Sequence, residues 1–389
     1  MKSQDTLNKT INPVLKLLID YAVPIMFILI VVVATPVSGF SLGFLANEIM
    51  TRLCRNSFLI LSLLIPVMAG MGMNFGMVLG AMAGEIALIF ITDWNIVGIS
   101  GILLAMLIAT PIAIVFGYFA GVVLNKATGR EMVTGLMLGF FMNGVYQLLV
   151  LYGMGKLIPI TNKDILLTRG YGIRNAINLD GIRQCLDNII KLDLFGVQIP
   201  VVTLLVIAAL CLFIVWFRKT KLGQDMRTVG QDMEVARTAG IDVNKTRIVS
   251  IVISTVLASY GMIIFLQNMG TLNTYNSHEQ IGFFCIAALL VGGASVTKAS
   301  IPNVFVGVIL FHTVFVVSPR AGKELIGEAQ LGEYFRVFIT YGVIAFSLAL
   351  YAWRRKVEQE NERKKAMILH KASLQKQGEG GVSLEKIDN

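Results

Sequence analysis

Apolar residues return along this chain in runs of about 20, and short polar segments separate the runs. A run of this length crosses the hydrocarbon core of a bilayer as one α-helix. The period-2 alternation of membrane β-strands is absent. Because backbone polar groups must be satisfied inside lipid, the pattern predicts an all-α, polytopic integral membrane protein with about ten transmembrane helices. The predicted spans are residues 21–37, 57–73, 74–91, 96–124, 131–152, 197–217, 248–267, 281–297, 300–318 and 334–352.

The composition supports the membrane prediction and changes the meaning of the charge. Of 389 residues, 55% are apolar and 15% are charged, against about a quarter charged in soluble domains. A net charge of +9 on a soluble domain would suggest nucleic-acid binding. Here the basic residues lie between apolar runs, where they set the topology and face anionic membrane lipid. No nucleic-acid partner is expected.

The distribution of basic residues predicts how the chain is organised across the membrane. About two thirds of the 33 basic residues lie on one side if both termini are cytoplasmic, as the positive-inside rule requires. We therefore expect a cytoplasmic segment over 1–20, a transmembrane domain over 21–352 and a charged cytoplasmic tail over 353–389. The domain carries an outer loop over 153–196, either a folded polar cap or an unstructured linker.

Glycines interrupt two of the apolar runs. Gly70 to Gly76 break one run in the first half, and residues 291–295 break another in the second half. Paired broken helices indicate a possible internal pseudo-repeat around a transport pathway. Close helix packing is the alternative, since several glycines are four residues apart. We expect pathway lining only near Asn74 and Gly292.

No constellation for covalent chemistry is present in the sequence. The chain has no phosphate-binding loop, no serine elbow and no metal-ligand spacing. We therefore expect no enzyme activity, no catalytic residue, no metal and no cofactor in this chain. Polar groups inside lipid are costly, so each is a candidate for the substrate pathway, although a hydrogen bond between helices is the alternative. These candidates are Glu85, Asn143, Gln147 and His312.

A polar segment over 218–247 contains a short predicted helix. Asp232 suits an N-terminal cap and Gly240 a left-handed stop. The two turns between them carry Val235, Ala236 and Ala239 on one side. Such a helix fits a groove on a partner; a loop helix lying on the membrane surface is the alternative.

This segment resembles the cytoplasmic loop of the branched-chain amino acid and simple-sugar permease family of ABC importers. A second run, Ala287 to Ser295 with Gly307 downstream, is similar to the family's A-x-x-x-G-G-x-S pattern. The loop residues that match are Lys221, Leu222, Gly223, Arg227, Val229, Gly230, Ala236, Arg237, Gly240, Ile241 and Val243.

The resemblance implies one permease subunit of an importer in a bacterial-type plasma (inner) membrane. Its partners would be a second permease (the same chain or a paralogue), ABC ATPase subunits that bind the ATP, and an extracytoplasmic solute-binding protein. The loop over 218–247 would couple this chain to the ATPase. The residues expected at that contact are Arg227, Gly230, Asp232, Glu234, Ala236, Arg237 and Gly240.

Residues 129–138 look most like the nucleoside-transporting branch of the family. That branch has an asparagine where this chain has Gly139, and Asn143, one helical turn further on, could supply the polar group. The expected substrate is a nucleoside or a related ribosylated compound, with a simple sugar second. The rival interpretation is a stand-alone, ion-gradient-driven transporter with Glu85 and His312 as a proton relay.

Overall fold

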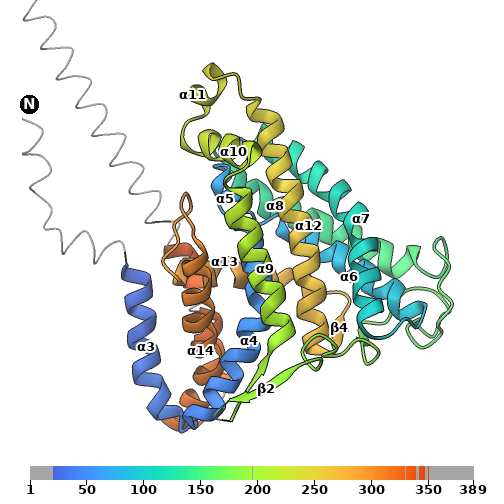
Figure 1. Cartoon of the computed structure of the whole chain (residues 1–389). Coiled ribbons are helices and arrows are strands. Elements are labelled where there is room, and N and C mark those ends of the chain that lie inside the picture. Colours follow the sequence, from blue (N-terminus) through green and yellow to red (C-terminus); the bar gives the residue numbers. More distant parts are fainter. Residues whose placement is uncertain (1–20, 195, 329, 339–340, 347–348, 350–389) are drawn as a thin grey trace, which may run out of the picture. The chain divides into compact units, whose positions relative to one another are not determined.

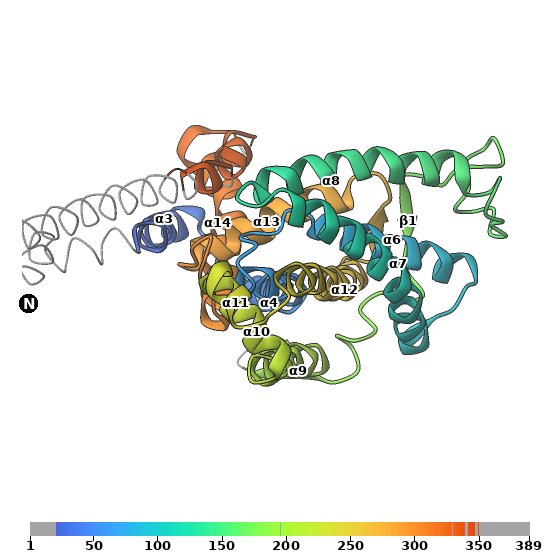
Figure 2. The same ribbon diagram turned by 90° about the horizontal axis from the view of Figure 1, so that it is seen from above.

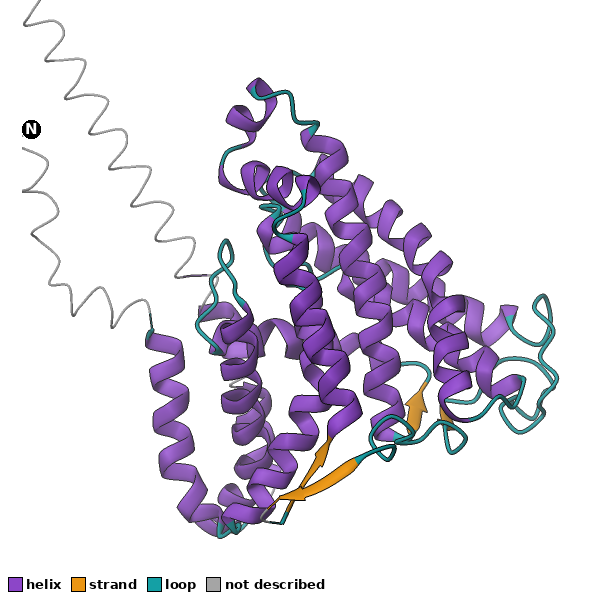
Figure 3. Cartoon of the chain, in the orientation of Figure 1, coloured by secondary structure: helices purple, strands orange, loops and turns teal. Residues whose placement is uncertain are grey.

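The computed structural model describes residues 21–194, 196–328, 330–338, 341–346 and 349 (Figure 1). The predicted cytoplasmic segments 1–20 and 353–389 lie outside the described residues. The chain divides into one unit over Met1–Ile344 and a second over Ala345–Asn389, and the first unit holds every labelled helix and strand named below. It consists mainly of helices, with four short strands (Figure 3).

The helices are α3 (Ala22–Ser38), α4 (Leu42–Ser62), α5 (Leu64–Met68), α6 (Met77–Asp93), α7 (Gly98–Lys126), α8 (Glu131–Leu148) with the π-helical turn η1 (Leu149–Gly153), α9 (Val201–Phe217), α10 (Lys221–Gln231), α11 (Met233–Thr238), α12 (Val243–Met269), α13 (Ser277–Val291) and α14 (Ile301–Ile326). Residues 330–338 and 341–346 are also helical. The strands are β1 (Ala176–Asn178), β2 (Lys191–Leu194), β3 (Val197–Pro200) and β4 (Thr271–Asn273).

Five helical segments in the described part of the chain are long and apolar enough to cross a membrane, or six if the pair α9 and α10, bent by 74°, is one broken span. Two further apolar helices, α3 and α13, are shorter. The all-α membrane class therefore agrees with the structure, whereas the prediction of ten spans is not confirmed. The five are 42–68, 98–126, 131–153, 243–269 and 301–325.

The predicted second span was placed too late in the sequence. A helix over 57–73 was expected, but α4 begins at Leu42, after the Ser41 hydroxyl accepts a hydrogen bond from the Phe44 amide at 3.3 Å. Three charged residues, Glu48, Arg52 and Arg55, interrupt the apolar pattern near this start, so the pattern did not indicate it. In the structure, Arg52 pairs with Glu48 at 3.4 Å, and the Arg55 guanidinium lies 5.2 Å from the centre of the Phe265 ring.

Helix α12 forms the centre of the unit and packs against α4, α6 and α7 (Figure 2). Glycines allow these close contacts. A Cβ added at Gly80 would lie 2.3 Å from the Thr255 carbonyl oxygen, and one at Gly84 would lie 2.7 Å from that of Ser259. These glycines of α6 therefore serve close helix packing, the alternative that the four-residue spacing had left open.

The two ends of the unit differ. One end carries α10 and α11, and the other carries the strands (Figure 1). At the strand end β1 pairs with β4 and β2 pairs with β3, both antiparallel. The buried Asp187 carboxylate accepts hydrogen bonds from Thr203 at 2.5 Å, Gln267 at 3.1 Å and Asn268 at 2.8 Å. These bonds attach the segment 179–190 to α9 and α12, so this part of the outer loop is folded.

Candidate functional site

A chain of polar side chains joins α6, α8 and α13 inside the helical unit. His278 Nδ1 lies 2.8 Å from Glu85 Oε2, and His278 Nε2 lies 2.9 Å from Asn143 Oδ1. The Glu85 and His278 side chains are fully buried. Three helices that are far apart in sequence thus meet through hydrogen bonds where the surroundings are apolar.

His278 lies between two oxygen-bearing partners. Asn143 Nδ2 donates to Glu279, so Asn143 Oδ1 faces His278 Nε2, while Glu85 Oε2 faces His278 Nδ1. A neutral imidazole has one N–H donor and one acceptor nitrogen, so the tautomer decides which of the two contacts the ring donates to. The ring thereby connects the Glu85 carboxyl group of α6 with the Asn143 amide of α8.

Two further groups surround this polar chain. Gln147 Nε2 donates to Asn143 Oδ1 at 3.3 Å and to the Tyr275 carbonyl at 3.5 Å. The Tyr146 ring packs edge-on against the His278 ring, with 4.8 Å between the ring centres. The buried Tyr146 hydroxyl interacts with the Glu85 carboxyl group. Tyr146 therefore belongs to the same polar chain.

A small pocket opens beside this polar chain between α8 and α13. Gly139 and Asn143 line it from α8, and Glu279 and Gly282 line it from α13. The Glu279 side chain is half-buried, whereas Phe140, on the rim, is exposed. Gly139 and Asn143 thus share one pocket, as their spacing of one helical turn predicts. The pocket measures only about 20 Å³, room for about one water molecule, and an amide and a carboxylate meet at it.

The other predicted pathway residues do not join this cluster. The buried Asn74 side chain accepts a hydrogen bond from the Gly76 amide at 2.9 Å and shapes the turn before α6. Gly292 lies where α13 crosses α14, and a Cβ there would be 1.8 Å from the Asn303 carbonyl oxygen. His312 is buried among the rings of Phe311 and Phe315. Asn74 Nδ2 and His312 Nδ1 are buried without a hydrogen-bond partner among the described residues, and a pathway role for these three positions stays a prediction.

Sequence reasoning did not single out His278 and Glu279, which the structure places in the polar chain of α6, α8 and α13. Two neighbouring ionisable residues at the beginning of an apolar run were the signal that could have identified them. In the described part of the chain, no group of three or more His, Cys, Asp or Glu residues could hold a metal ion.

The predicted short helix of the polar segment is confirmed as α11. The Asp232 carboxylate caps it by accepting hydrogen bonds from the amides of Glu234 at 2.8 Å and Val235 at 3.1 Å. After the helix, Gly240 has φ +79°, in the left-handed region that favours glycine. Both boundaries depend on local chemistry, which explains why the sequence predicted them.

The residues of this segment divide between exposed and inward positions. Arg227 is exposed, as are Glu234 and Arg237, which pair with each other at 2.6 Å. Ala236 was predicted on a partner-facing side, but it is fully buried and packs against Val229 and Val243. Its side chain is therefore not available to a partner in this structure.

Gly230 also has a role within the chain. A Cβ added there would lie 2.3 Å from the Met68 carbonyl oxygen and 3.0 Å from the Gly70 amide nitrogen. The end of α10 thus rests directly on the glycine-rich break between α5 and α6. A movement of α10 must therefore shift this break.

A family model described as "Branched-chain amino acid transport system / permease component" matches residues 61–348. The match covers more than half of the chain and includes the polar chain of α6, α8 and α13 as well as α10 and α11. The chain belongs to this permease family. It is thus a transport protein of the ABC permease class and not an enzyme.

Known permeases show distant similarity to this permease. The nucleoside ABC transporter permease proteins NupB and NupC of Lactococcus lactis subsp. cremoris are 26% and 24% identical over 57% and 64% of this chain, and the matches cover 59% and 73% of their own lengths. The xylose transport system permease protein XylH of Haemophilus influenzae is 28% identical over 36% of each chain. The permease thus spans little more than a third of this xylose relative. No solved structure matches the permease at a significant level.

One buried guanidinium connects several segments at the α10–α11 end of the permease. Arg247, in the second turn of α12, forms an ion pair with Glu131, the first residue of α8. It also donates to Thr128 at 3.0 Å, and its Nε lies 2.8 Å from the Met71 sulfur atom. The Arg247 side chain is only 3% exposed. It therefore joins α12 to α8 and to the break after α5.

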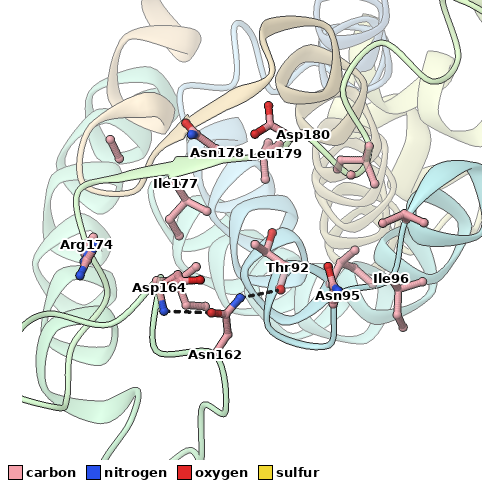
Figure 4. Close-up of a pocket in the computed structure, with 16 residues that line it drawn as sticks. Thr92, Asn95, Ile96, Asn162, Asp164, Arg174, Ile177, Asn178, Leu179 and Asp180 are labelled. Atoms are coloured by element: carbon pink, nitrogen blue, oxygen red, sulfur yellow. Dashed lines mark hydrogen bonds between the residues drawn. The ribbon is translucent and has the colours of Figure 1, made fainter.

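An open polar pocket of about 490 Å³ lies at the opposite end of the permease (Figure 4). The turn after α6 and two stretches of the outer loop form its walls. The Asn162 side chain reaches between them: its Oδ1 accepts from the Asp164 amide at 2.9 Å, and its Nδ2 donates to the Thr92 carbonyl at 3.4 Å (Figure 4). The Asp93 carboxylate accepts hydrogen bonds from the backbone amides of Thr161 and Asn162. These bonds hold this loop on α6.

Proposed function

We propose that this permease forms half of the membrane pathway of an ATP-driven importer for a nucleoside or a related ribosylated compound. The observation that carries the proposal is the pocket between α8 and α13, where Asn143 and Glu279 lie side by side and the Glu85–His278 pair supports them. An amide and a carboxylate together can bind ribose hydroxyls and the edge of a base. The remaining lining is apolar or glycine. Since the pocket of one subunit holds only about 20 Å³, the facing second subunit would have to complete the binding site.

The relatives support the order of the candidate substrates. The two nucleoside permeases match this chain over 57% and 64% of its length, the galactofuranose transporter permease protein YtfT of Escherichia coli over 50%, and the xylose permease over 36%. A simple sugar is the second candidate, because it offers similar hydroxyl groups to the same two side chains. A pocket that binds only hydroxyls would accept both classes, whereas contact with a base would select the nucleoside.

The proposed topology places both termini and the α10–α11 end in the cytoplasm, with the strand end outside. The loop over 218–247 then faces ABC ATPase subunits, which bind the ATP, and the outer loop over 153–196 faces the solute-binding protein. Helices α3, α6 and α13 are proposed to lie within the membrane, although they are shorter than full spans. The transmembrane domain extends over 21–352, with cytoplasmic segments 1–20 and 353–389.

A second permease subunit, either the same chain or a paralogue, would complete the pathway. The α8 face beside the pocket is exposed and apolar, with Met137, Phe140 and Phe141 all more than half exposed. We propose that the pocket side of α8 faces the pathway between the two subunits. The helices are broken at 69–76 and again at 292–300. The proposal therefore includes an internal pseudo-repeat, in which these two breaks correspond.

The ion-gradient alternative depended on a relay between Glu85 and His312. No hydrogen bond joins these two residues in the described part of the chain; Glu85 instead pairs with His278. A gradient-driven mechanism would therefore need another relay. The ATP-driven proposal is supported by membership of the ABC permease family.

Two experiments test the proposal in order. Mass spectrometry of proteins that co-purify with the tagged chain from its host membrane should recover an ATPase with a phosphate-binding loop and show whether the second permease is a paralogue. Repeated recovery of the tagged chain alone would contradict the importer assignment. The second experiment measures uptake of labelled uridine, adenosine and xylose by host cells that carry only a variant permease.

In that assay, Asn143→Ala and Glu279→Gln should each reduce nucleoside uptake at least tenfold, which corresponds to the loss of one hydrogen bond to a charged or buried group. The matched controls Asn125→Ala and Glu48→Gln change the same residue types outside the pocket and should transport normally. Unchanged nucleoside uptake in both pocket variants would refute the site. Xylose uptake that falls while no nucleoside is transported would identify the sugar as the substrate.

A further inference from the structure

A second cavity, of about 490 Å³, lies at the α10–α11 end, away from the pocket of α8 and α13. Its walls come from α5, the end of α9, α10 and the loop that precedes α14. One side is apolar and includes Leu64, Val67 and Ile214. The other side is polar and basic. The cavity therefore has an amphipathic lining.

Three cations from three separate segments line the basic side. Arg218 follows α9, Arg227 belongs to α10, and Lys298 lies in the loop between α13 and α14. Arg227 was expected at the ATPase contact, but it lines this cavity, so the proposed ATPase contact is assigned to α11. All three are exposed, and none of their side chains forms an ion pair within the described part of the chain. No acidic residue lines the cavity. Three like charges around one cavity repel one another, so an anion bound between them stabilises the arrangement.

The N-terminus of α14 adds to the positive potential. Ser300, the capping residue of α14, and Ile301, the first helical residue, both line the cavity. The helix dipole places partial positive charge at this end of the 26-residue helix. The cations and the helix end thus favour the same kind of ligand.

The position of the cavity relative to the membrane indicates the source of the anion. Trp216, at the end of α9, is 61% exposed. Exposed tryptophan at the end of an apolar helix is typical of the membrane–water interface. The chain then bends by 74° between α9 and α10. Arg218, two residues after Trp216, is therefore at the depth of the lipid headgroups.

We propose that this cavity binds the headgroup phosphate of an anionic phospholipid, with the glycerol and upper acyl carbons against the apolar side. A free phosphate ion would use the same cations but would leave the apolar wall without a partner. The bound phosphate connects α9, α10 and the loop before α14. Since α10 also rests on the break after α5 through Gly230, the lipid holds α10 in the position described here. This lipid site does not depend on the identity of the transported solute.

The test measures lipid binding to the full-length permease purified in mild detergent, with native mass spectrometry. The probes are phosphatidylglycerol, phosphatidylcholine and inorganic phosphate. Phosphatidylglycerol should bind to the wild-type chain, and the triple variant Arg218→Gln, Arg227→Gln and Lys298→Gln should bind it more weakly, by roughly fivefold for each cation removed.

The matched control removes three exposed basic residues from the same end outside the cavity: Lys126→Gln, Arg130→Gln and Lys245→Gln. It should retain wild-type affinity for phosphatidylglycerol. If the triple cavity variant does not fold, the single variant Lys298→Gln replaces it. We expect that variant to bind phosphatidylglycerol about fivefold more weakly than the wild-type chain. Equal binding to the cavity variant and the control, or equal binding of phosphatidylcholine to the wild-type chain, would overturn the proposal. Binding of inorganic phosphate without phosphatidylglycerol would overturn the lipid source.

Discussion

His278 Nδ1 lies 2.8 Å from Glu85 Oε2, and the two residues are 193 positions apart in the sequence. Both side chains are fully buried. A buried polar group without its partner costs the full desolvation of that group. This contact therefore both holds α13 on α6 and makes the pair sensitive to the loss of either member.

Replacing Glu85 by Leu should destabilise the permease by about 1–3 kcal/mol, because His278 Nδ1 is then left buried without its hydrogen-bond partner. The double variant Glu85→Leu and His278→Leu should recover part of this loss. Thermal unfolding of the purified permease in detergent measures both. Glu48→Gln, which breaks an exposed pair with Arg52, is the control and should change stability by less than about 0.5 kcal/mol. If Glu85→Leu and Glu48→Gln lowered the stability equally, the buried pair would have no special role.

Two glycine substitutions should have opposite effects on stability. At Gly292 an added Cβ would lie 1.8 Å from the Asn303 carbonyl oxygen, so Gly292→Ala should separate α13 from α14 and cost about 1–3 kcal/mol. At Gly144 in α8 no atom lies within 4 Å of the added Cβ. Gly144→Ala should therefore stabilise the helix by about 0.5–1 kcal/mol. Unfolding temperatures that shift in the same direction would refute this packing argument.

The segment that carries α11 should not tolerate substitutions that alter the end of this helix. Gly240→Pro replaces a residue with φ +79° by one fixed near −65°. Arg237→Glu places a second carboxylate beside Glu234, its present partner at 2.6 Å. Both variants should remain in the membrane but lose most solute uptake and recover less ATPase on purification. Lys126→Glu, at the same end outside this segment, should behave as wild type, and normal uptake by both variants would exclude the coupling role.

Arg247 and Glu131 form a buried ion pair between α12 and α8, with side chains 3% and 13% exposed. Glu131→Gln leaves the buried guanidinium without its charge partner, and we expect a loss of about 3–5 kcal/mol. Exchanging both residues, Arg247→Glu with Glu131→Arg, should restore part of the stability. A double-mutant cycle on unfolding measures the coupling between the two. Independent effects of the two changes would mean that the pair contributes little.

The Cys185 thiol in the outer loop should show a displaced pH dependence of alkylation. Burial, and then the nearby Asp187 carboxylate, raise the pKa of this thiol above its ordinary value. Since the thiolate is the reactive form, alkylation by a maleimide should begin at higher pH in the folded permease than in the same protein unfolded in detergent. The measurement uses a chain in which Cys54, Cys211 and Cys285 are replaced by alanine. Coincident folded and unfolded profiles would contradict the shift.

Several features were predictable because they depend on neighbouring residues. Asp232 and Gly240 bound α11, since a cap and a left-handed stop act within one turn of the helix. Asn143 and Gln147 share one face of α8 because they are four residues apart. The start of α4 was missed because Glu48 and Arg52 interrupt the apolar run, although they pair with each other in the structure.

The sequence by itself determined that this is a helical membrane protein, because lipid requires long apolar helices and leaves few positions for charge. The permease class followed from the resemblance of the polar segment and of residues 287–295 to the permease family. The sequence also determined the boundaries of the polar segment that carries α11. Only the tertiary structure decided that Glu85 pairs with His278 and not with His312, that Glu279 joins Asn143 at a pocket, and that Ala236 faces inward. The physical reason is that such contacts depend on how helices pack and rotate against one another. A periodic pattern gives the face of one helix but not the partner of each residue.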